Sequence, residues 1–364
     1  MFAIILAGGA GTRLRPLTYA RRKELVPLLN RPLLEYRLLN LRSHGVLDIV
    51  LACSQGMREV EEHFGDGGAL GVRLQYHYEE RPLGSGRAVK QAARMAGAQG
   101  TLVVCNGDIL TNVDLGAMIE QHSRTGATLS ISLAAVEDPW HFGVVEIDED
   151  WRIRRFVEKP PQGEEPSNLI NAGTWLWEPA MLDRIADDDS AVRDGFSERV
   201  LFPGIIEDGL RVQGFEEDLW IDVGAPDRYL RATAMLLERT ARELGDETIV
   251  LEGAKVDDAA ELSGRVLVAA RASIAAGARL IGPTVVGDGS SVAAEALVEA
   301  SVIWERSAIG AEAEIRGCII GARVAIGAGA RVRDAVIADG AEIAAGAVLE
   351  AGAKVMPGER VAAS

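Results

Sequence analysis

The sequence lacks the features that mark several large protein classes. It has only three cysteines in 364 residues, widely spaced, which gives neither a disulfide framework nor a metal-binding pattern. Cys53, Cys105 and Cys318 stand in apolar runs, so we expect buried, reduced thiols. No apolar run approaches the roughly 18 residues of a membrane helix, and the N-terminus has no basic start. These absences predict a cytoplasmic protein without a membrane span.

Positive charge is also scarce. The chain has 38 Lys and Arg against 54 Asp and Glu, a formal net charge of −16, and no basic stripe. This balance argues against a nucleic-acid partner, so any phosphate must be bound by a local arrangement of residues. The five histidines are scattered without metal-ligand spacing, and none lies beyond His141.

The first candidate site follows the first apolar run, Phe2–Leu6. Three glycines, Gly8, Gly9 and Gly11, are followed by Thr12 and Arg13. Glycines let the backbone N–H groups approach an anion, and Arg13 adds a planar cation, so the segment predicts a strand that enters a phosphate-binding loop. Such a loop is a weak signal alone, because most glycine-rich loops are turns. It lacks the third glycine of a dinucleotide fingerprint, and the chain has no Gly-Lys-Ser/Thr of a P-loop.

The region that contains this loop alternates strand-like and helix-like segments. The predicted strands are Phe2–Leu6, Ile49–Cys53, Leu74–Tyr78 and Leu102–Cys105, and the predicted helices are Pro32–Arg42, Met57–His63 and Ser85–Met95. This order predicts a mostly parallel, doubly wound α/β sheet, whose ligands lie at the carboxyl ends of the strands. Asn106-Gly107-Asp108 follows the last of these strands, so we expect it beside the glycine loop.

A different pattern begins near residue 247. Aliphatic residues recur every six positions from Val250 to Val298, and the period resumes after five-residue steps at Ile303, Ile320 and Ile337. Neither a helix nor an alternating strand has this period, which predicts a triangular parallel β-helix of hexapeptide repeats. We therefore divide the chain into an α/β domain over residues 1–243 and a β-helix domain over residues 244–364.

A family resemblance covers nearly the whole chain. The motifs that carry it are Leu6–Thr18 with Lys23, Pro27 and Pro32, then Pro82–Gly86, Asn106–Asp108, Phe142–Val145, Glu158–Pro160, Asn171–Gly173 and Trp220–Gly224. In this order they resemble the sugar-nucleotide pyrophosphorylases, nucleotidyltransferases that make NDP-sugars. Mannose-1-phosphate guanylyltransferases are most similar, through Glu79–Gly84, Phe156–Gly173 and the appended repeat. The resemblance implies a Rossmann-like mixed sheet of the GT-A-like type followed by a left-handed β-helix.

The implied reaction joins an NTP and a hexose-1-phosphate to give an NDP-sugar and pyrophosphate. Arg13, Lys23 and Asp108 would be catalytic, and Asp108 with Asp222 would hold Mg²⁺. The nucleotide would be bound by Leu6, Ala7, Gly8, Gly9, Gly11, Thr12, Arg13, Gly84 and Ser85. The sugar phosphate would be bound by Gly143, Glu158, Lys159, Asn171 and Gly173.

Several alternatives stay open at this point. GTP with mannose-1-phosphate is favoured, and dTTP or UTP with glucose-1-phosphate is the alternative. A non-catalytic sugar-nucleotide-binding regulatory subunit is a third possibility, because Arg21-Arg22 stands where the family usually has proline before the lysine, and Gly86-Arg87 replaces small residues. Some relatives carry an acyltransferase on the β-helix, but that chemistry needs a base, usually histidine, and none follows residue 141. We expect the β-helix to form a homo-oligomer.

Overall fold

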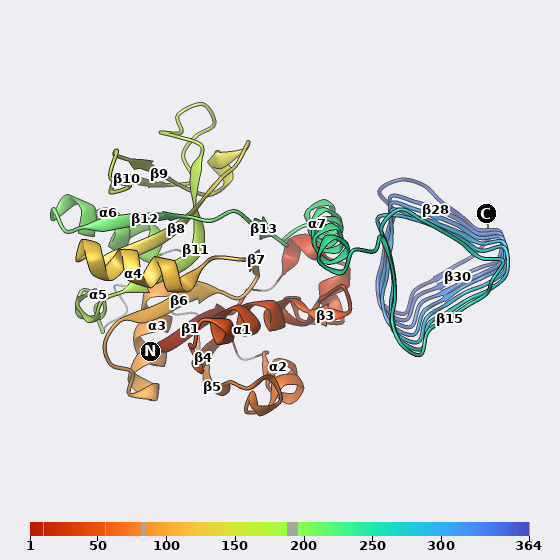
Figure 1. Cartoon of the computed structure of the whole chain (residues 1–364), viewed down its shortest axis with the longest axis horizontal. Coiled ribbons are helices and arrows are strands. Elements are labelled where there is room, and N and C mark those ends of the chain that lie inside the picture. The colour runs from red at the N-terminus through yellow and green to blue at the C-terminus, as the bar shows by residue number, and fades with distance from the viewer. Residues whose placement is uncertain (10, 55, 82–83, 188–195, 364) are drawn as a thin grey trace. The chain divides into compact units, whose positions relative to one another are not determined.

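The structure is a computed structural model that describes residues 1–9, 11–54, 56–81, 84–187 and 196–363 (Figure 1). Packing divides the chain into two compact units. The sheet unit comprises Met1–Gly9 and Leu34–Ile221, and the solenoid unit comprises Ala10–Leu33 and Asp222–Ser364. The predicted boundary after residue 243 stays a prediction. No helix in the described part of the chain is long and apolar enough to cross a membrane.

The sheet unit is built on one mixed nine-stranded sheet. Its main path runs β10-β9-β11-β6-β1-β4-β5, and β8 and β12 extend it beside β11. The neighbours β6, β1, β4 and β5 are parallel, whereas β11 is antiparallel to β6 and β8. The strands are β1 (Phe2–Ala7), β4 (Asp48–Cys53), β5 (Arg73–Tyr78), β6 (Leu102–Asn106), β8 (Leu129–Ala135), β9 (Gly143–Ile147), β10 (Ile153–Glu158), β11 (Leu169–Trp177) and β12 (Val212–Glu216).

The helices of this unit follow the strands as predicted. They are α1 (Leu33–Ser43), α2 (Arg58–Phe64), α3 (Ser85–Ala96), α4 (Leu115–Thr125), α5 (Pro179–Asp183), the π-helical turn η7 (Ser197–Leu201) and α6 (Phe202–Glu207). The four predicted strands and three predicted helices are confirmed, with ends that differ by one residue at most. A Rossmann-like mixed sheet was expected, and it is the architecture observed.

A buried cluster on one side of this sheet joins strands and helices. Trp175 and Trp177 on β11 are fully buried and pack edge-on against Phe202 of α6.

The shorter strands β7 (Ile109–Thr111) and β13 (Trp220–Asp222) form a two-stranded sheet. The cysteines of the unit, Cys53 and Cys105, are buried, reduced thiols, as predicted.

The solenoid unit contains the predicted β-helix, seen along its axis as a triangle in Figure 1. Its three parallel sheets have the orders β14-β17-β20-β23-β26-β29-β32, β15-β18-β21-β24-β27-β30-β33 and β16-β19-β22-β25-β28-β31. The first sheet comprises Thr248–Val250, Val266–Val268, Thr284–Val286, Val302–Ile303, Ile319–Ile320, Val336–Ile337 and Lys354–Val355. The second comprises Lys255–Val256, Ser273–Ile274, Ser291–Val292, Ala308–Ile309, Ala325–Ile326, Glu342–Ile343 and Arg360–Val361. The third comprises Glu261–Ser263, Arg279–Ile281, Leu297–Glu299, Glu314–Arg316, Arg331–Arg333 and Val348–Leu349.

The six-residue period arises because each face of a coil contributes one aliphatic side chain to the interior. These residues form one continuous buried core along the solenoid. The five-residue steps arise because three coils have one residue fewer at the corner that leads into a strand of the first sheet. Ser301, Cys318 and Ala335 occupy this corner and are buried. Val250, the first residue of the predicted row, is 46% exposed because it lies on the first coil of the stack.

The solenoid unit also holds two segments from outside the β-helix. One is helix α7 (Pro226–Leu244). The other covers residues 11–33, and its regular structure consists of the short 3₁₀ turns η1 (Thr12–Leu14), η2 (Leu17–Tyr19) and η3 (Lys23–Leu25) and the hairpin β2 (Pro27–Leu28) and β3 (Arg31–Pro32). We call this second segment the cation loop, because it carries Arg13 and Lys23.

Candidate functional site

The glycine-rich motif begins at the carboxyl end of β1, in the middle of the sheet. Leu6 and Ala7 are its last strand residues, and the exposed Gly8 and Gly9 follow. The neighbouring β6 ends at the same edge, since Leu6 lies opposite Asn106 in the parallel register. The predicted neighbourhood of the two strand ends is therefore confirmed. Ala10, the middle residue of the motif, lies outside the described residues.

Gly11 brings two parts of the cation loop together. Its φ of 59° is in the left-handed region, where glycine is favoured. A Cβ at this position would lie 3.0 Å from the Thr18 Cγ2 and 3.3 Å from the Lys23 Cβ. The Thr18 hydroxyl donates a 2.7 Å hydrogen bond to the Gly11 carbonyl. Glycine at this position thus lets Lys23 pack directly against the start of the loop.

Asp222 is the centre of a cation cluster. Its Oδ2 accepts from the Arg13 Nη2 at 3.2 Å and the Arg228 Nη1 at 2.9 Å. Its Oδ1 lies 3.7 Å from the Lys23 Nζ. Lys23 and Asp222 are buried, whereas the Arg13 side chain is 62% exposed. We call these four residues the Asp222 cluster.

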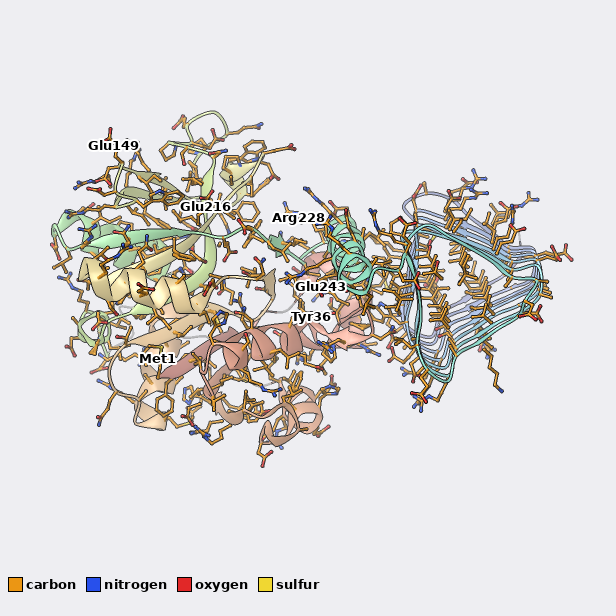
Figure 2. The ribbon with its side chains drawn as sticks, viewed as in Figure 1. Met1, Tyr36, Glu149, Glu216, Arg228 and Glu243 are labelled. Carbon is orange, nitrogen blue, oxygen red and sulfur yellow. The ribbon has the colours of Figure 1, made fainter. Side chains whose placement is uncertain are left out.

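Two residues near Asp222, Gly224 and Arg228, complete the surroundings of the Asp222 cluster. Gly224 is the last residue of the Trp220–Gly224 motif. A Cβ on Gly224 would lie 2.6 Å from the Asp222 Oδ1 and 2.7 Å from the Arg13 Nη2, so glycine at 224 makes room for the arginine. Arg228, labelled in Figure 2, stands in the first turn of α7, where the helix dipole disfavours a cation unless an anion compensates. Sequence reasoning missed Arg228, although a basic residue six positions after Asp222 was a usable signal.

The charges of the cluster indicate what it can bind. Three cations against one carboxylate leave two formal positive charges, in a chain whose net charge is −16. Exposed guanidinium nitrogens suit planar, bidentate contacts to phosphate oxygens, and a buried ammonium acts as a point charge. The cluster is therefore suited to a polyphosphate. Thr12, exposed beside Arg13, begins the η1 turn.

Asp108 belongs to the sheet unit. It follows Asn106 and Gly107 at the carboxyl end of β6 and is half-buried. The Gly107 N–H donates to the Leu6 carbonyl, and a Cβ at Gly107 would come within 3.1 Å of Ile5. Close packing against β1 therefore requires the glycine, and it fixes the turn that presents Asp108 at this edge of the sheet.

Gly84 and Ser85 begin helix α3. Gly84 has a φ of 76°, and the two residues before it, Pro82 and Leu83, lie outside the described residues. The Ser85 hydroxyl donates to the Glu198 Oε2 at 3.0 Å and accepts from the Ser197 N–H at 3.1 Å. The Arg87 guanidinium donates to the Asp187 carbonyl at 2.9 Å. Ser85 thus connects α3 to the π-helical turn η7 through two hydrogen bonds.

A second group of charged residues lies where β9 and β10 pair. Gly143 lies opposite Glu158 in the antiparallel register, and a Cβ there would come within 2.8 Å of the Glu158 Oε2 and 2.5 Å of Phe156. Lys159 has a φ of 50° and an exposed side chain, with its Nζ 3.9 Å from the Glu158 Oε1. Gly143, Glu158 and Lys159 therefore form one compact site.

Glu198 extends this site and was missed by sequence reasoning. Burial raises the pKa of Glu158, and the nearby Glu198 carboxylate raises it further, while Lys159 and Arg199 lower it. Burial likewise raises the pKa of Glu198. Glu198 lies in a π-helical turn, a feature frequently found at functional sites, but no sequence periodicity signals such a turn. Two carboxylates beside two cations provide acceptors for hydroxyl groups and a positive charge for an anion.

Asn171 and Gly173 lie on β11. The Asn171 Oδ1 accepts from the Gly173 N–H at 3.1 Å and the Trp175 Nε1 at 2.8 Å, so its amide nitrogen is the group left to meet a ligand. Gly173 has a φ of 77°, and a Cβ there would lie 2.8 Å from the Asn106 Nδ2. Close approach between β11 and the end of β6 thus requires glycine at this position.

The sequence-predicted residues therefore form two sets. Gly11, Arg13, Lys23 and Asp222 meet in the solenoid unit. In the sheet unit, the ends of β1 and β6 carry Leu6, Ala7, Gly8, Gly9 and Asp108. Three separate contacts in the same unit join Ser85 to Glu198, Glu158 to both Gly143 and Lys159, and Asn171 to Gly173. Among the residues that the structure describes, no three or more His, Cys, Asp or Glu side chains form a group able to hold a metal ion.

Comparison with known families assigns both parts of the chain. Residues 2–239 match the nucleotidyl transferase family, and residues 262–364 match the GMPPB C-terminal domain. The first match lies within the predicted α/β domain, and the second lies within the predicted β-helix domain.

Individual relatives share most of the length. A mannose-1-phosphate guanylyltransferase of Mycobacterium tuberculosis is 35% identical over 306 residues, 82% of each chain. A UTP–glucose-1-phosphate uridylyltransferase of Synechocystis is 31% identical over 322 residues, 83% of this chain and 82% of the relative. A crystal structure of a putative glucose-1-phosphate thymidylyltransferase from Bacillus anthracis has a TM-score of 0.57 at 25% identity, and the match covers 65% of this chain and 95% of that one.

Proposed function

This chain belongs to the nucleotidyl transferase family, and we propose that it joins a nucleoside triphosphate and a hexose-1-phosphate into an NDP-sugar, with release of pyrophosphate. The observation that carries the proposal is the Asp222 cluster. It directs Arg13 and Lys23, from a glycine-rich loop, and Arg228, from α7, toward one carboxylate. Such a concentration of positive charge in an acidic chain suits a triphosphate.

The chemistry makes clear why these cations are needed. A phosphate oxygen of the sugar attacks the α-phosphorus of the NTP, the bond from that phosphorus to the β-phosphate oxygen breaks, and pyrophosphate leaves with the electron pair. Two polyanions must be held together, and negative charge builds on the leaving group, so positioning and charge neutralisation do the catalytic work. We assign Arg13 to the outer phosphates and the buried Lys23 to the α-phosphate and the leaving pyrophosphate, with no protein nucleophile. The loop residues Leu6, Ala7, Gly8, Gly9, Gly11 and Thr12, together with Gly84 and Ser85, form the rest of the nucleotide site.

The sugar-1-phosphate is assigned to the charged site of the sheet unit. Lys159, whose side chain is 58% exposed, is suited to the sugar phosphate. The Glu158 carboxylate accepts from sugar hydroxyls, and the Asn171 amide nitrogen donates to them. Gly143 and Gly173 are assigned to the same site, because the lack of a Cβ there lets the Glu158 and Asn106 side chains lie against the backbone.

A divalent cation, Mg²⁺, is part of the proposal, and the donor types fit it. Mg²⁺ usually binds through one or two carboxylates together with substrate phosphates, which suits Asp108 and Asp222. Asp222 can serve as a ligand once Arg13 and Lys23 have turned from its carboxylate to phosphate oxygens. When bound, the metal supplies charge neutralisation on the triphosphate.

The test is pyrophosphate release from each of the four NTPs paired with mannose-1-phosphate or glucose-1-phosphate, with Mg²⁺. We expect GTP with mannose-1-phosphate to be used best, as the name of the M. tuberculosis relative suggests. Faster turnover of UTP or dTTP with glucose-1-phosphate would support the alternative suggested by the uridylyltransferase and thymidylyltransferase relatives. Lys23→Ala should lose the activity, whereas the exposed Lys255→Ala on the solenoid is the matched control.

Absence of pyrophosphate release with every pair would reject the enzyme and favour a non-catalytic regulatory subunit. Binding of GDP-mannose, measured by thermal shift, would then identify a sugar-nucleotide sensor, because a ligand stabilises the folded state in proportion to RT ln(1 + [L]/Kd). The Asp222 cluster argues for the enzyme, since a product sensor needs no cation for a leaving pyrophosphate.

Two further properties belong to the same proposal. We place the reaction in the cytoplasm, where the thiols of Cys53, Cys105 and Cys318 stay reduced. We also expect a homo-oligomer formed through the β-helix. Its second sheet lines a hollow of about 650 Å³, and small residues such as Ser291, Ala308 and Ala325 are among the residues that line it. Light scattering that gives a monomer mass at micromolar concentration would reject the oligomer.

A further inference from the structure

The cation loop has little regular structure of its own to fix Lys23. Within residues 11–33 the regular elements are three short 3₁₀ turns and one hairpin of two-residue strands. Such turns have poor hydrogen-bond geometry, and ordering the backbone of a loop costs about 1–2 kcal/mol per residue. Contacts made by other parts of the solenoid unit must therefore hold the loop.

The first of these contacts is made by Arg21, two residues before Lys23. Its guanidinium forms an ion pair with Glu305 and lies 3.5 Å from the Asp339 Oδ2. The Arg21 guanidinium carbon also lies 5.1 Å from the centre of the Trp304 ring, in cation–π contact. Only 19% of the Arg21 side chain is exposed. All three partners belong to the β-helix.

A second contact holds the loop on the other side of Lys23. The Tyr229 hydroxyl donates to the Pro27 carbonyl at 2.5 Å and accepts from the Trp304 Nε1 at 2.8 Å. Tyr229 and Trp304 are both fully buried. Tyr229 lies next to Arg228 on α7, so one helix end contributes both to this contact and to the Asp222 cluster.

The β-helix presents these partners at one corner of its coils. Asp288, Glu305 and Asp339 recur at this corner, and the backbone ladder joins Arg306 to Asp288 and Arg323 to Glu305. Asp339 is buried, its Oδ1 accepts from the Ala322 N–H, and its Oδ2 lies 3.5 Å from Arg323 as well as from Arg21. A buried carboxylate is stable only when it is paired, and Asp339 is paired with Arg323 of the β-helix and with Arg21 of the cation loop.

We propose that Arg21 is a positioning residue: the solenoid corner formed by Trp304, Glu305 and Asp339 holds the cation loop through Arg21, and so keeps Lys23 and Arg13 at Asp222. This inference rests on the proposed function, which gives Lys23 and Arg13 their roles. It also assigns a role to Arg21, the first of the two arginines that precede Lys23. The β-helix is, in this view, part of the catalytic machinery and not only an oligomerisation surface.

The test compares two arginines that bind the same corner. Arg21→Ala removes the loop contact, and Arg271→Ala removes the ion pair with Asp288, one coil away and with a 73% exposed arginine. We expect kcat/KM for the NTP to fall about 10- to 100-fold in Arg21→Ala, since a displacement near 1 Å can cost 100-fold. Arg271→Ala should stay within about twofold of the wild type. Equal rates in both variants and the wild type would overturn the inference.

A double variant separates positioning from general structure. If Arg21 acts through Lys23, then adding Arg21→Ala to Lys23→Ala should lower the residual rate no further, whereas independent effects would multiply. Multiplied effects would reject the inference. If Arg21→Ala does not fold, Glu305→Gln removes the same ion pair while keeping the side-chain shape, and the same comparison applies. If the wild-type protein releases no pyrophosphate, that result rejects the proposed function and not the inference about Arg21. In that case calorimetry decides: weaker NTP binding by Arg21→Ala than by Arg271→Ala would support the inference, and equal binding would reject it.

Discussion

Replacing Gly224 with alanine tests directly whether the Asp222 cluster is the phosphate site. The new Cβ would lie 2.6 Å from the Asp222 Oδ1 and 2.7 Å from the Arg13 Nη2, where ordinary contacts begin at 3.4 Å. The φ of Gly224 is outside the left-handed region, so alanine brings no backbone strain there. The substitution therefore acts on the two side chains and leaves the chain path intact.

The size of the effect follows from which group can move. Asp222 is buried and also bound by Arg228 at 2.9 Å, whereas the Arg13 side chain is 62% exposed, so Arg13 should retreat by about 0.7 Å. The new Cβ also lies 2.6 Å from the Oδ1 of the buried Asp222, and overpacking of this kind costs about 1–3 kcal/mol, so we expect the free energy of unfolding to fall by that amount. A misplaced phosphate-binding group costs much more in rate, and we expect a 10- to 100-fold lower kcat/KM for the NTP, from the roughly 100-fold cost of a 1 Å displacement.

The assay is steady-state pyrophosphate release, with thermal unfolding of the same samples. Gly204→Ala is the matched control: Gly204 lies in α6, and a Cβ there would meet nothing within 4 Å. Because alanine favours helix over glycine, Gly204→Ala should keep its activity and gain up to about 1 kcal/mol in stability. If Gly224→Ala keeps the wild-type kcat/KM while remaining folded, Arg13 does not position the triphosphate from this site.

Three further predictions concern other parts of the chain. Asp108→Ala should abolish pyrophosphate release while the thermal unfolding midpoint changes by only a few degrees, and a variant with near-native rate would contradict the catalytic role of Asp108. Burial raises the pKa of Glu217 from 4.5 to about 8, against the lowering effect of Arg37. The folded state therefore binds the Glu217 proton more tightly than the unfolded state does. As a result, the free energy of unfolding should fall as pH rises from about 4.5 through 8. Glu217→Gln should flatten this slope in denaturant titrations, whereas a large loss of stability at pH 7 would mean that Glu217 is the ionised partner of Arg37. A thiol reagent should modify none of Cys53, Cys105 and Cys318 in the native protein and all three after unfolding. The reason is burial, which raises the pKa of Cys318 to about 11 and also raises the pKa of Cys105. Fast labelling of the native protein would refute this prediction.

The fold was predictable from the sequence because its two periodicities are strong. Apolar runs bounded by glycine and polar residues located β1, β4, β5 and β6 within one residue, and a six-residue period has few structural solutions other than a β-helix. The grouping of the cation loop with the β-helix was not predictable. It depends on Arg21, Tyr229 and Trp304, which are far apart in the chain and carry no shared pattern.

The candidate site was predictable only in part, for a similar reason. Motifs identified Arg13, Lys23 and Asp222, and the structure brings these three together. The motifs did not identify Arg228, although it lies only six positions after Asp222. They did not identify Glu198 either, because its contact with Ser85 joins residues far apart in the chain. Glycines were the most informative residues after the charges: Gly11, Gly143, Gly173 and Gly224 each stand where a Cβ would collide with a proposed site residue or its neighbour.

The Asp222 cluster suggests why a carboxylate assigned to a metal is needed before any substrate binds. Lys23 is 5% exposed, and an ammonium at that depth is costly unless an anion accompanies it. Arg228 stands at a helix N-terminus, where the dipole also disfavours a cation. Asp222 offsets both costs and keeps the two cations, with Arg13, at one point of the chain. In the proposed function a triphosphate then replaces the carboxylate as their partner, so Asp222 would hold the positive charge of the cation loop in place in advance of the nucleotide.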